Sequence, residues 1–230
     1  MAVSPNVTWQ DGNISRARRW QALGACGATV WLTGLPASGK STLGAALEQR
    51  LVEAGRFAYL LDGDNLRHGL CGDLGFSQDD RTQNMLRAGE VAQLFADGGA
   101  VAIVALVSPL AAVRDEVRRR HAAAQLPFME VFVDTPLEEC VSRDPKELYA
   151  RARAGEIRGF TGVDEPYEPT AQPELVVRPG LGVAGAVDAV LRLLDGAGAP
   201  PGAPGREPPR RRSHGGPGLG AIHQRNGVKR

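Results

Sequence analysis

The residues with the clearest chemical potential form one contiguous loop, Gly34-Leu35-Pro36-Ala37-Ser38-Gly39-Lys40-Ser41. The loop fits G-x-x-x-x-G-K-[ST], the phosphate-binding pattern. Its glycines allow successive backbone N–H groups to turn inward, and a following helix adds partial positive charge at its N-terminus. Lys40 would reach the β- and γ-phosphates, and Ser41 would offer its hydroxyl to Mg²⁺. The pattern therefore predicts a binding site for a nucleoside triphosphate.

The segments on either side of this loop match the order that the mechanism requires. Residues 28–33 are rich in β-branched and aromatic side chains and predict a short buried strand. Residues 41–54 predict a helix, with leucines at 43, 47 and 51 on one stripe and Gly55 as its stop. A glycine-rich turn that fits the pattern by chance would not be expected to lie between such a strand and such a helix.

Two carboxylates follow the next predicted strand, at residues 56–61. Asp62 and Asp64 come directly after it, and ligands of open α/β sheets bind outside the carboxyl ends of the strands. The two side chains supply a base and a polar contact for an acceptor beside the phosphate loop. A simple turn is the weaker interpretation of Asp-Gly-Asp-Asn in this position.

Motor and switch proteins with a phosphate loop place an Asp after a buried strand, where it steadies Mg²⁺. The most apolar run, residues 100–107, ends without a carboxylate. Asp134 does end the strand predicted at 128–133, but N-capping of the next helix explains it. The pattern favours a small-molecule kinase over a motor or a switch.

The rest of the chain alternates between strands and helices, which predicts a three-layer α/β domain with a mainly parallel sheet. The further elements are expected at helix 81–97, strand 100–107, helix 109–124, strand 128–133, short helix 136–143, strand 174–177 and helix 183–194. Residues 144–170 interrupt the alternation. This charged insertion has no long apolar stripe, and we expect an active-site lid rather than an idle surface loop.

Both ends of the chain differ from the middle. Residues 1–24 are expected to form an N-terminal arm with a short helix near 15–23. Its two tryptophans, Trp9 and Trp20, would dock the arm on the body or serve a subunit contact. The domain itself is expected over 25–195. From Gly196 onward a Gly/Pro-rich tail carries seven basic residues against one acidic residue, and its composition predicts disorder. Such a tail is an arm for an anionic partner or a solvated extension, and we favour the latter, because charge alone is weak evidence for a partner.

Composition excludes several classes. The chain has 230 residues, 43% hydrophobic and 23% charged, as in soluble globular proteins. Its apolar runs are strand-sized, and the first twenty residues lack the apolar core of a secretory signal. Three scattered cysteines, at 26, 71 and 140, predict neither a disulfide framework nor a zinc site. We therefore expect reduced thiols, a cytoplasmic location and no membrane partner.

Taken together, these motifs resemble the adenylylsulfate kinase family, which phosphorylates adenosine 5′-phosphosulfate (APS) at its 3′-hydroxyl. The similar segments recur in the family's order over roughly residues 5–195. They are residues 29–35 before the loop, 61–70, 73–77, 89–92, 94–97, 130–137, 143–146 and 151–162. The glycine loop alone is unspecific, whereas the Asp-Gly-Asp-Asn block and the lid segment are highly specific.

The resemblance implies a P-loop kinase fold with a five-stranded sheet and a lid over about 144–170. It implies ATP and Mg²⁺, a homodimer, a role in sulfate activation and a functional link to an ATP sulfurylase. The catalytic residues would be Asp62, Lys40 and Ser108, with Ser41 and Asp62 at the metal. The nucleotide would be held by Gly34, Leu35, Pro36, Ala37, Ser38, Gly39, Lys40, Ser41, Thr42 and Arg143. The acceptor would be held by Asp64, Arg67, Phe76, Arg81, Asn84, Val107, Ser108, Lys146, Gly159 and Phe160, with the two phenylalanines around its adenine.

Ser108 matches a family serine described as a possible phosphoryl carrier. As a nucleophile it needs an activating base, and Val107, Pro109 and Leu110 supply none. We expect Ser108 to cap a helix that opens at Pro109 and to contact bound APS.

The sequence departs from the family at Cys71-Gly72, at Val104 to Val107 and at Leu110, none of which removes a charged partner. Two other functions remain open. One is a kinase for a nucleotide or a sugar acid, which the Asp62–Arg67 block and the lid disfavour. The other is a nucleic-acid-binding protein that uses the tail, although the tail has no aromatic residue for base stacking.

Overall fold

The computed structural model of the chain describes residues 6–8, 10 and 12–196. Trp9 and the basic residues of the predicted tail lie outside these residues. Among the described helices, none is long and apolar enough to cross a membrane.

Five parallel strands form the central sheet, in the order β2-β3-β1-β4-β5. They are β1 (Ala28–Thr33), β2 (Ala58–Asp62), β3 (Val101–Ala105), β4 (Phe128–Val133) and β5 (Leu175–Val177). Leu32 of β1 pairs with Ala105 on one side and Val131 on the other. All six residues of β1 are buried, as expected of a parallel strand covered on both faces.

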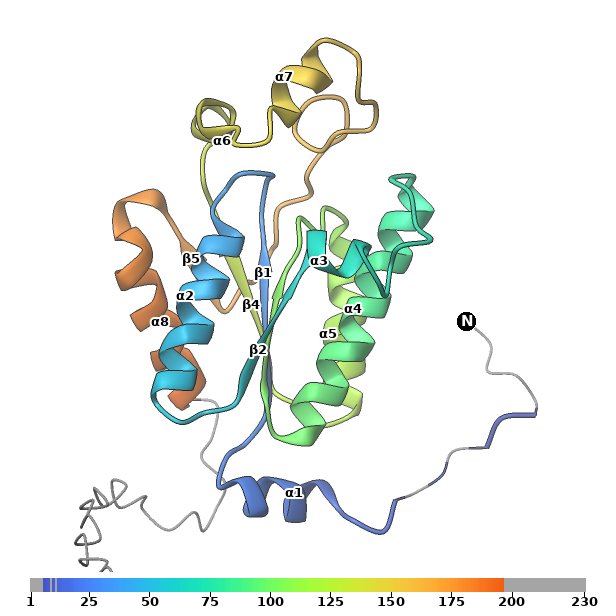
Figure 1. Cartoon of the computed structure of the whole chain (residues 1–230), viewed down its shortest axis with the longest axis vertical. Coiled ribbons are helices and arrows are strands. Elements are labelled where there is room, and N and C mark those ends of the chain that lie inside the picture. The colour runs from blue at the N-terminus through green and yellow to red at the C-terminus, as the bar shows by residue number, and fades with distance from the viewer. Residues whose placement is uncertain (1–5, 9, 11, 197–230) are drawn as a thin grey trace, which may run out of the picture.

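Two pairs of helices cover the sheet, as Figure 1 shows. One face carries α2 (Lys40–Glu53) and α8 (Gly182–Gly196), and the other carries α4 (Gln78–Gly98) and α5 (Ala111–Ala123). Neighbouring residues of β1 divide between the two cores, because strand side chains alternate. Leu32 packs in the α2 and α8 core, while Trp31 packs in the α4 and α5 core. The predicted three-layer P-loop kinase fold is confirmed.

The N-terminal helix α1 (Arg16–Leu23) lies at the end of the sheet opposite the lid (Figure 1). Ser15 caps it, and the Trp20 Nε1 group donates to the Ala96 carbonyl at 3.2 Å. Arg16 forms a salt bridge with Asp97 at 2.7 Å. Trp20 therefore docks the arm on the body, which was one of its two predicted roles.

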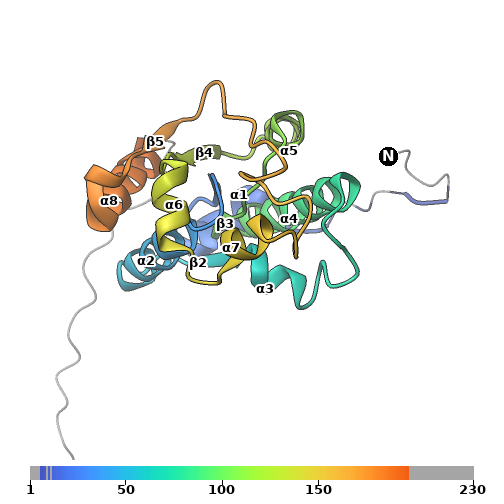
Figure 2. The same cartoon turned by 90° about the horizontal axis from the view of Figure 1, so that it is seen from above.

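The remaining elements lie near the carboxyl ends of the strands or lead into α8. They are α3 (Gly63–Arg67), α6 (Leu137–Arg143), α7 (Leu148–Arg153) and the 3₁₀ turn η1 (Pro179–Leu181). Seen from above in Figure 2, α6 and α7 lie over the strands of the sheet. The predicted lid thus contains its own helix, α7, and a bridge between Thr161 and Glu165.

Two local predictions need correction, and one short helix was not predicted. Helix α4 begins at Gln78 rather than Arg81, because Ser77 accepts a hydrogen bond from the Asp80 N–H at 3.1 Å and caps it. The sequence did not predict α3. The expected N-cap at Asp134 is wrong: α6 begins at Leu137 with no side-chain cap. The Asp134 carboxylate instead lies 3.4 Å from the Arg178 Nε atom.

Candidate active site

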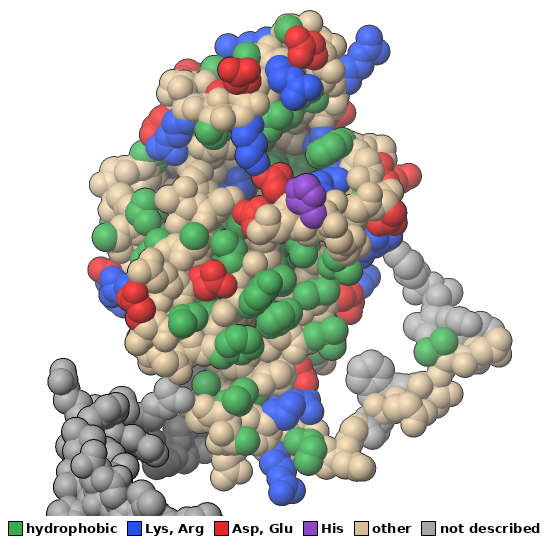
Figure 3. Space-filling model, viewed as in Figure 1, with side chains coloured by type: hydrophobic (Ala, Val, Ile, Leu, Met, Phe, Trp, Pro, Cys, Tyr) green, Lys and Arg blue, Asp and Glu red, His purple; other side chains and the backbone are tan. Residues whose placement is uncertain are grey.

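A cavity of about 760 Å³ opens at the carboxyl ends of the strands. The phosphate loop forms one wall, α3 and α4 form another, and residues 105–109 and the lid complete it. In Figure 3 charged side chains gather where the lid meets the body. Most of the predicted site residues line this cavity: Pro36, Ala37, Gly39, Lys40, Ser41, Thr42, Asp62, Asp64, Arg67, Phe76, Arg81, Asn84, Val107, Ser108, Arg143, Lys146 and Phe160.

Two glycines give the phosphate loop its shape. Gly34 has φ +146°, and a Cβ there would lie 2.5 Å from the Val133 carbonyl oxygen, so a side chain does not fit. Gly39 has φ +106° and precedes α2 without a side-chain cap. The first N–H groups of α2 therefore stay available for an anion, and the helix dipole favours negative charge there.

Lys40 lies inside the loop and is only 7% exposed. Its Nζ donates to the Gly34 and Leu35 carbonyls at 3.0 and 2.6 Å and to the Ser38 hydroxyl at 3.3 Å. Burial lowers the pKa of Lys40 to about 8. The loop thus holds a strongly desolvated ammonium group where phosphate is expected.

Ser41 and Asp62 meet across the cavity. The Ser41 hydroxyl donates to Asp62 Oδ2 at 2.6 Å, while Asp62 Oδ1 accepts from the Asp64 N–H at 3.0 Å and caps α3. Both hydrogen bonds fix the carboxylate, which retains free lone pairs.

These two oxygens suit Mg²⁺, which takes one or two protein oxygens and otherwise water and substrate phosphate. Among the described residues no group of three or more His, Cys, Asp or Glu forms a metal cage. The donor set therefore fits a metal held largely by its nucleotide.

Arg67 supports the acceptor side of the cavity. Its Nη1 atom donates to the Leu74 and Gly75 carbonyls at 3.1 and 2.8 Å. Its guanidinium carbon lies 4.2 Å from the centre of the Phe76 ring. Arg67 thus orders the loop that carries Phe76, whose other face is largely exposed at the cavity.

Arg81 joins the backbones beside both aromatic residues. Its Nε donates to the Phe76 carbonyl at 2.9 Å, its Nη1 to Thr161 Oγ1 at 2.6 Å, and its Nη2 to the Gly159 carbonyl. Gly159 and Thr161 flank Phe160, so one guanidinium fixes the chain on either side of the predicted adenine clamp. The structure therefore gives Arg81 a supporting role in addition to its charge.

Asn84 is the clearest unsatisfied group at the site. It is 5% exposed, and its Nδ2 is the buried side-chain atom that lacks a hydrogen-bond partner among the described residues. Leaving such a donor unpaired costs about 1–3 kcal/mol. Asn84 also lines the cavity, and its side chain is therefore a candidate contact for a ligand.

Side chains in the lid and just before it contact the body on opposite sides of the cavity. Lys146 of the lid forms a salt bridge with Asp64 of α3. Arg143, at the end of α6, donates to the Ser38 carbonyl at 3.3 Å, and the Tyr149 hydroxyl of α7 donates to the Pro36 carbonyl at 3.0 Å. The lid therefore contacts both the phosphate loop and the acceptor side.

Ser108 does not have the predicted capping role. Helix α5 begins at Ala111, and its Leu110 N-cap makes no side-chain bond. Ser108 has φ +42° and lies 3% exposed, where its Oγ accepts from Trp31 Nε1 at 3.1 Å and donates to Thr33 Oγ1 at 2.8 Å. Neither partner is a base. The buried network accounts for a serine in the strained left-handed conformation.

Comparison with known proteins agrees with this geometry. A family model described as adenylylsulphate kinase matches residues 26–178. The adenylyl-sulfate kinase of Aeromonas salmonicida is 49% identical over 190 residues, which cover 82% of this chain and 96% of the relative. The chain belongs to the adenylylsulfate kinase family.

Solved structures extend the comparison. The structure of the Mycobacterium tuberculosis APS kinase CysC in complex with AMPPNP and APS has a TM-score of 0.72 and 50% identity, and the match covers 74% of this chain and 98% of that one. A hexameric APS kinase from Thiobacillus denitrificans has a TM-score of 0.58 and 32% identity, with coverages of 77% and 30%. The resemblance predicted from the motifs is confirmed, and with it an ATP-dependent kinase in place of the alternative functions.

Four of the predicted residues lie outside the cavity lining of this adenylylsulfate kinase family member, although they adjoin it. Gly34, Leu35 and Ser38 bond to Lys40, and the Gly159 carbonyl accepts from Arg81. Some lining residues were not predicted from the sequence, among them Met85, Leu106, Leu148 and Thr161. For Met85, Leu106 and Thr161 a signal was present, since each adjoins a predicted site residue.

Proposed function

We propose that this site transfers the γ-phosphoryl group of ATP to the 3′-hydroxyl of APS, giving 3′-phosphoadenosine 5′-phosphosulfate (PAPS). One observation carries the proposal. The phosphate loop and the acceptor residues line a single cavity, with Lys40 and Asp62 on its donor side and Phe76 and Phe160 on its acceptor side. Phosphoryl transfer is governed by positioning and electrostatics, which this arrangement provides.

On the donor side, the loop N–H groups and Lys40 bind the ATP phosphates, and Arg143 and Thr42 contact the nucleotide. Ser41 and Asp62 would hold Mg²⁺ through their side-chain oxygens. Bound there, the ion would neutralise charge on the β- and γ-phosphates. Asp62 also accepts the proton of the attacking hydroxyl, and its position is fixed by the bonds to Ser41 and to the Asp64 N–H.

On the acceptor side, Phe76 and Phe160 stack on the adenine of APS. Asn84 supplies the unpaired amide, and Asp64 orients Lys146 towards the anionic groups. The remaining contacts come from residues that border the cavity or support its walls, namely Arg67, Arg81, Val107, Ser108 and Gly159.

Transfer is direct in this proposal, with Ser108 as a wall residue and no covalent intermediate. The Ser108 hydroxyl lies among Trp31, Thr33 and the Leu106 carbonyl, none of which is a base that would activate it. Lid closure excludes water, which limits wasteful ATP hydrolysis.

The proposed setting is sulfate activation in the cytoplasm, with residues 25–195 as the catalytic domain. An enzyme that makes APS, such as an ATP sulfurylase, must supply the substrate. Cys71 and Cys140 are buried free thiols, which suits a reducing compartment. The proposal includes no nucleic-acid or membrane partner.

We also propose a homodimer that uses the free edge of the sheet. Strand β2 is an edge strand, and its Tyr59 is half-exposed and stacks on Phe95 of α4 at 5.3 Å. The adjacent Leu94 is 71% exposed, and such apolar surface is typical of subunit contacts. Sedimentation velocity should give a dimer for the wild type and a monomer for Leu94→Glu. A wild-type monomer would exclude the dimer.

The function is tested by ADP release with a panel of acceptors. We expect rapid release with APS and little with adenylate, gluconate or shikimate. Comparable turnover with one of those acceptors would reassign the substrate.

A further inference from the structure

Glu168 attaches the carboxyl end of the lid to the wall of the cavity. Its N–H, its carbonyl and one carboxylate oxygen bond to residues just before α5 or in its first turn. Its N–H donates to the Pro109 carbonyl at 3.0 Å, its Oε2 accepts from the Ala111 N–H at 2.6 Å, and its carbonyl accepts from Arg114 Nη2 at 2.7 Å. The capping contact that was expected from Ser108 thus comes from the lid, 57 residues after the Ala111 N–H that it satisfies.

A buried arginine reinforces the same junction. Arg114 is 1% exposed, and its Nη1 donates to the Ser108 carbonyl at 2.6 Å while its Nε pairs with Glu130 of β4 at 2.8 Å. The guanidinium therefore connects the lid end at Glu168, the cavity wall at Ser108 and the sheet. A charge-assisted set of this kind, in a buried place, holds its partners firmly.

The residue before Glu168 adds a second link. The Tyr167 hydroxyl lies 2.9 Å from Thr33 Oγ1, and its ring stacks on Phe132 at 5.7 Å. Thr33 in turn donates to the Val107 carbonyl at 2.9 Å. Two consecutive lid residues are therefore linked to the cavity wall formed by residues 107–109: Tyr167 through Thr33, and Glu168 directly.

We propose that Glu168 is a positioning residue for the acceptor: it joins the rear end of the lid to residues 107–109, so that lid and cavity wall hold APS as one unit. The inference rests on the proposed function. Glu168 does not line the cavity, whereas Val107, Ser108 and Pro109 do. Its effect on APS is therefore exerted through the backbone of these three residues.

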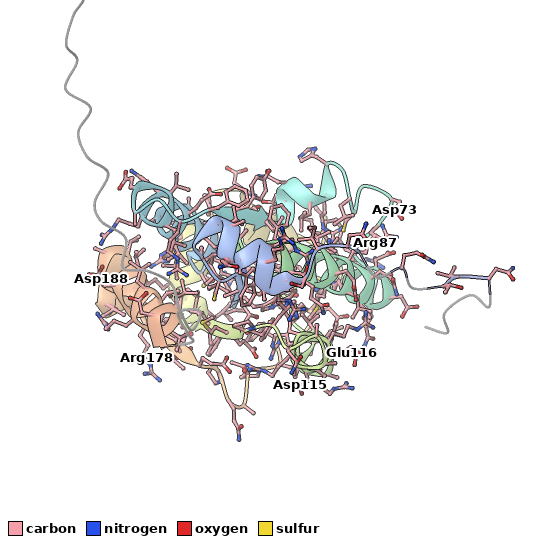
Figure 4. All side chains as sticks on the ribbon, turned by 90° about the horizontal axis from the view of Figure 1, so that it is seen from below. Asp73, Arg87, Asp115, Glu116, Arg178 and Asp188 are labelled. Atoms are coloured by element: carbon pink, nitrogen blue, oxygen red, sulfur yellow. The ribbon has the colours of Figure 1, made fainter. Side chains whose placement is uncertain are left out.

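Two substitutions and one matched control test this role. Glu168→Ala removes the acceptor for the Ala111 N–H, and Glu168→Gln keeps a carbonyl oxygen in its place. The control is Glu116→Ala on α5, the helix whose start Glu168 contacts; Glu116 is seen at the surface of α5 in Figure 4. Glu116 pairs with Arg119 and Arg120 at 2.8 and 2.7 Å, so its loss weakens α5 without touching the lid.

In steady-state kinetics, Glu168→Ala should raise KM for APS about five-fold, the factor that corresponds to a typical lost cap, with KM for ATP changed less than about two-fold. The ratio of ADP to PAPS formed should also rise. Glu168→Gln should restore wild-type values, and Glu116→Ala should leave both KM values unchanged. Equal rises in both KM values, or the same APS defect in Glu116→Ala, would overturn the proposal.

Hydrogen exchange gives a readout that does not depend on the reaction. In Glu168→Ala, amides of residues 104–112 should exchange faster than in wild type and in Glu168→Gln, although the substitution lies outside that peptide. Unchanged exchange there would show that Glu168 does not hold the wall, whatever the substrate is. A wild type that consumes no ATP with APS would contradict the proposed function instead.

Discussion

The two sides of the cavity are built in different ways. The donor side is built around one contiguous segment, residues 34–42, to which Asp62 and Arg143 are added, and the shape of this segment comes from glycine conformations and helix α2. The acceptor side collects α3, the start of α4, residues 105–109 and the lid, and long polar side chains link these parts. Local backbone shape therefore sets the position of the phosphates, while long-range contacts set which acceptor fits.

The charges of the two sides differ in exposure as well. Lys40 is 7% exposed, whereas the side chains of Lys146 and Asp64 are 57% and 65% exposed. Water screens the charges of Lys146 and Asp64 but not the buried charge of Lys40. Substitutions on the donor side should therefore lower kcat, and those on the acceptor side should chiefly raise KM for APS.

The largest effect is expected for Lys40→Ala. The substitution removes the ammonium group that we propose contacts the β- and γ-phosphates, and kcat should fall by about 10² or more, as for other preorganised charge donors. Steady-state kinetics measures the change, with a melting curve to show that the protein folds. Near-normal turnover would contradict the assignment of the phosphate loop.

Asp62→Asn should come next, with a fall in kcat of about 10² because a base is lost. APS should still bind, as equilibrium titration would show. Asp64→Asn is the matched control on the acceptor side, and it should raise KM for APS more than it lowers kcat. If both variants changed kcat and KM for APS alike, Asp62 and Asp64 could not be assigned to different sides of the cavity.

Phe76→Ala tests stacking on the acceptor side. Loss of one aromatic contact to a base should raise KM for APS by about ten-fold, since such contacts contribute roughly 1–3 kcal/mol. KM for ATP should stay unchanged. Leu181→Ala, at an exposed apolar side chain outside the cavity and away from the edge strand β2, serves as the control. A rise in KM for ATP of similar size would place Phe76 at the nucleotide.

The lowered pKa of Lys40, about 8, predicts a pH dependence for the donor side alone. Below pH 8 the lysine is protonated with and without nucleotide, so affinity is constant. Above pH 8, Lys40 of the free enzyme loses its proton, whereas bound phosphate keeps Lys40 protonated in the complex. The affinity for the nucleotide should therefore fall by up to about ten-fold per pH unit. Calorimetric titration with AMPPNP measures this, and Lys40→Met should be flat over the same range. A wild type as flat as Lys40→Met would contradict the buried, titrating lysine.

The smallest effect on rate is expected for Ser108→Ala. Direct transfer needs no carrier, so kcat should fall by less than a factor of about ten. Stability should fall by about 1–3 kcal/mol, because the Trp31 indole N–H loses a buried partner. Denaturant titration measures the second effect. A chiral γ-phosphoryl group should invert; retention together with an inactive variant would establish a covalent route.

The sequence predicted the donor side well because its information is local. The loop pattern, Lys40 and Ser41 stand in one run, and β1 and α2 follow from adjacent periodicity. The five strands also emerged, since each is a short apolar run between turns.

The acceptor side could be predicted only in part. Family motifs identified Asp64, Phe76 and Phe160, but not that one arginine, Arg81, joins the two aromatic segments. The cap of α5 was assigned to the wrong residue, because Ser before Pro is a local signal and Glu168 is 57 residues away from the N–H that it binds. No pattern within a short window contains such a contact.

The central claim is that a hydroxyl of APS on the acceptor side receives phosphate directly from ATP on the donor side, with water excluded. The most direct measurement compares ADP and PAPS formed from APS with ADP formed in the presence of its 3′-deoxy analogue. We predict ADP and PAPS in a one-to-one ratio with APS, and almost no ADP with the analogue. ADP release that is equally fast with both would contradict the account, because phosphate would then be passing to water or to another acceptor.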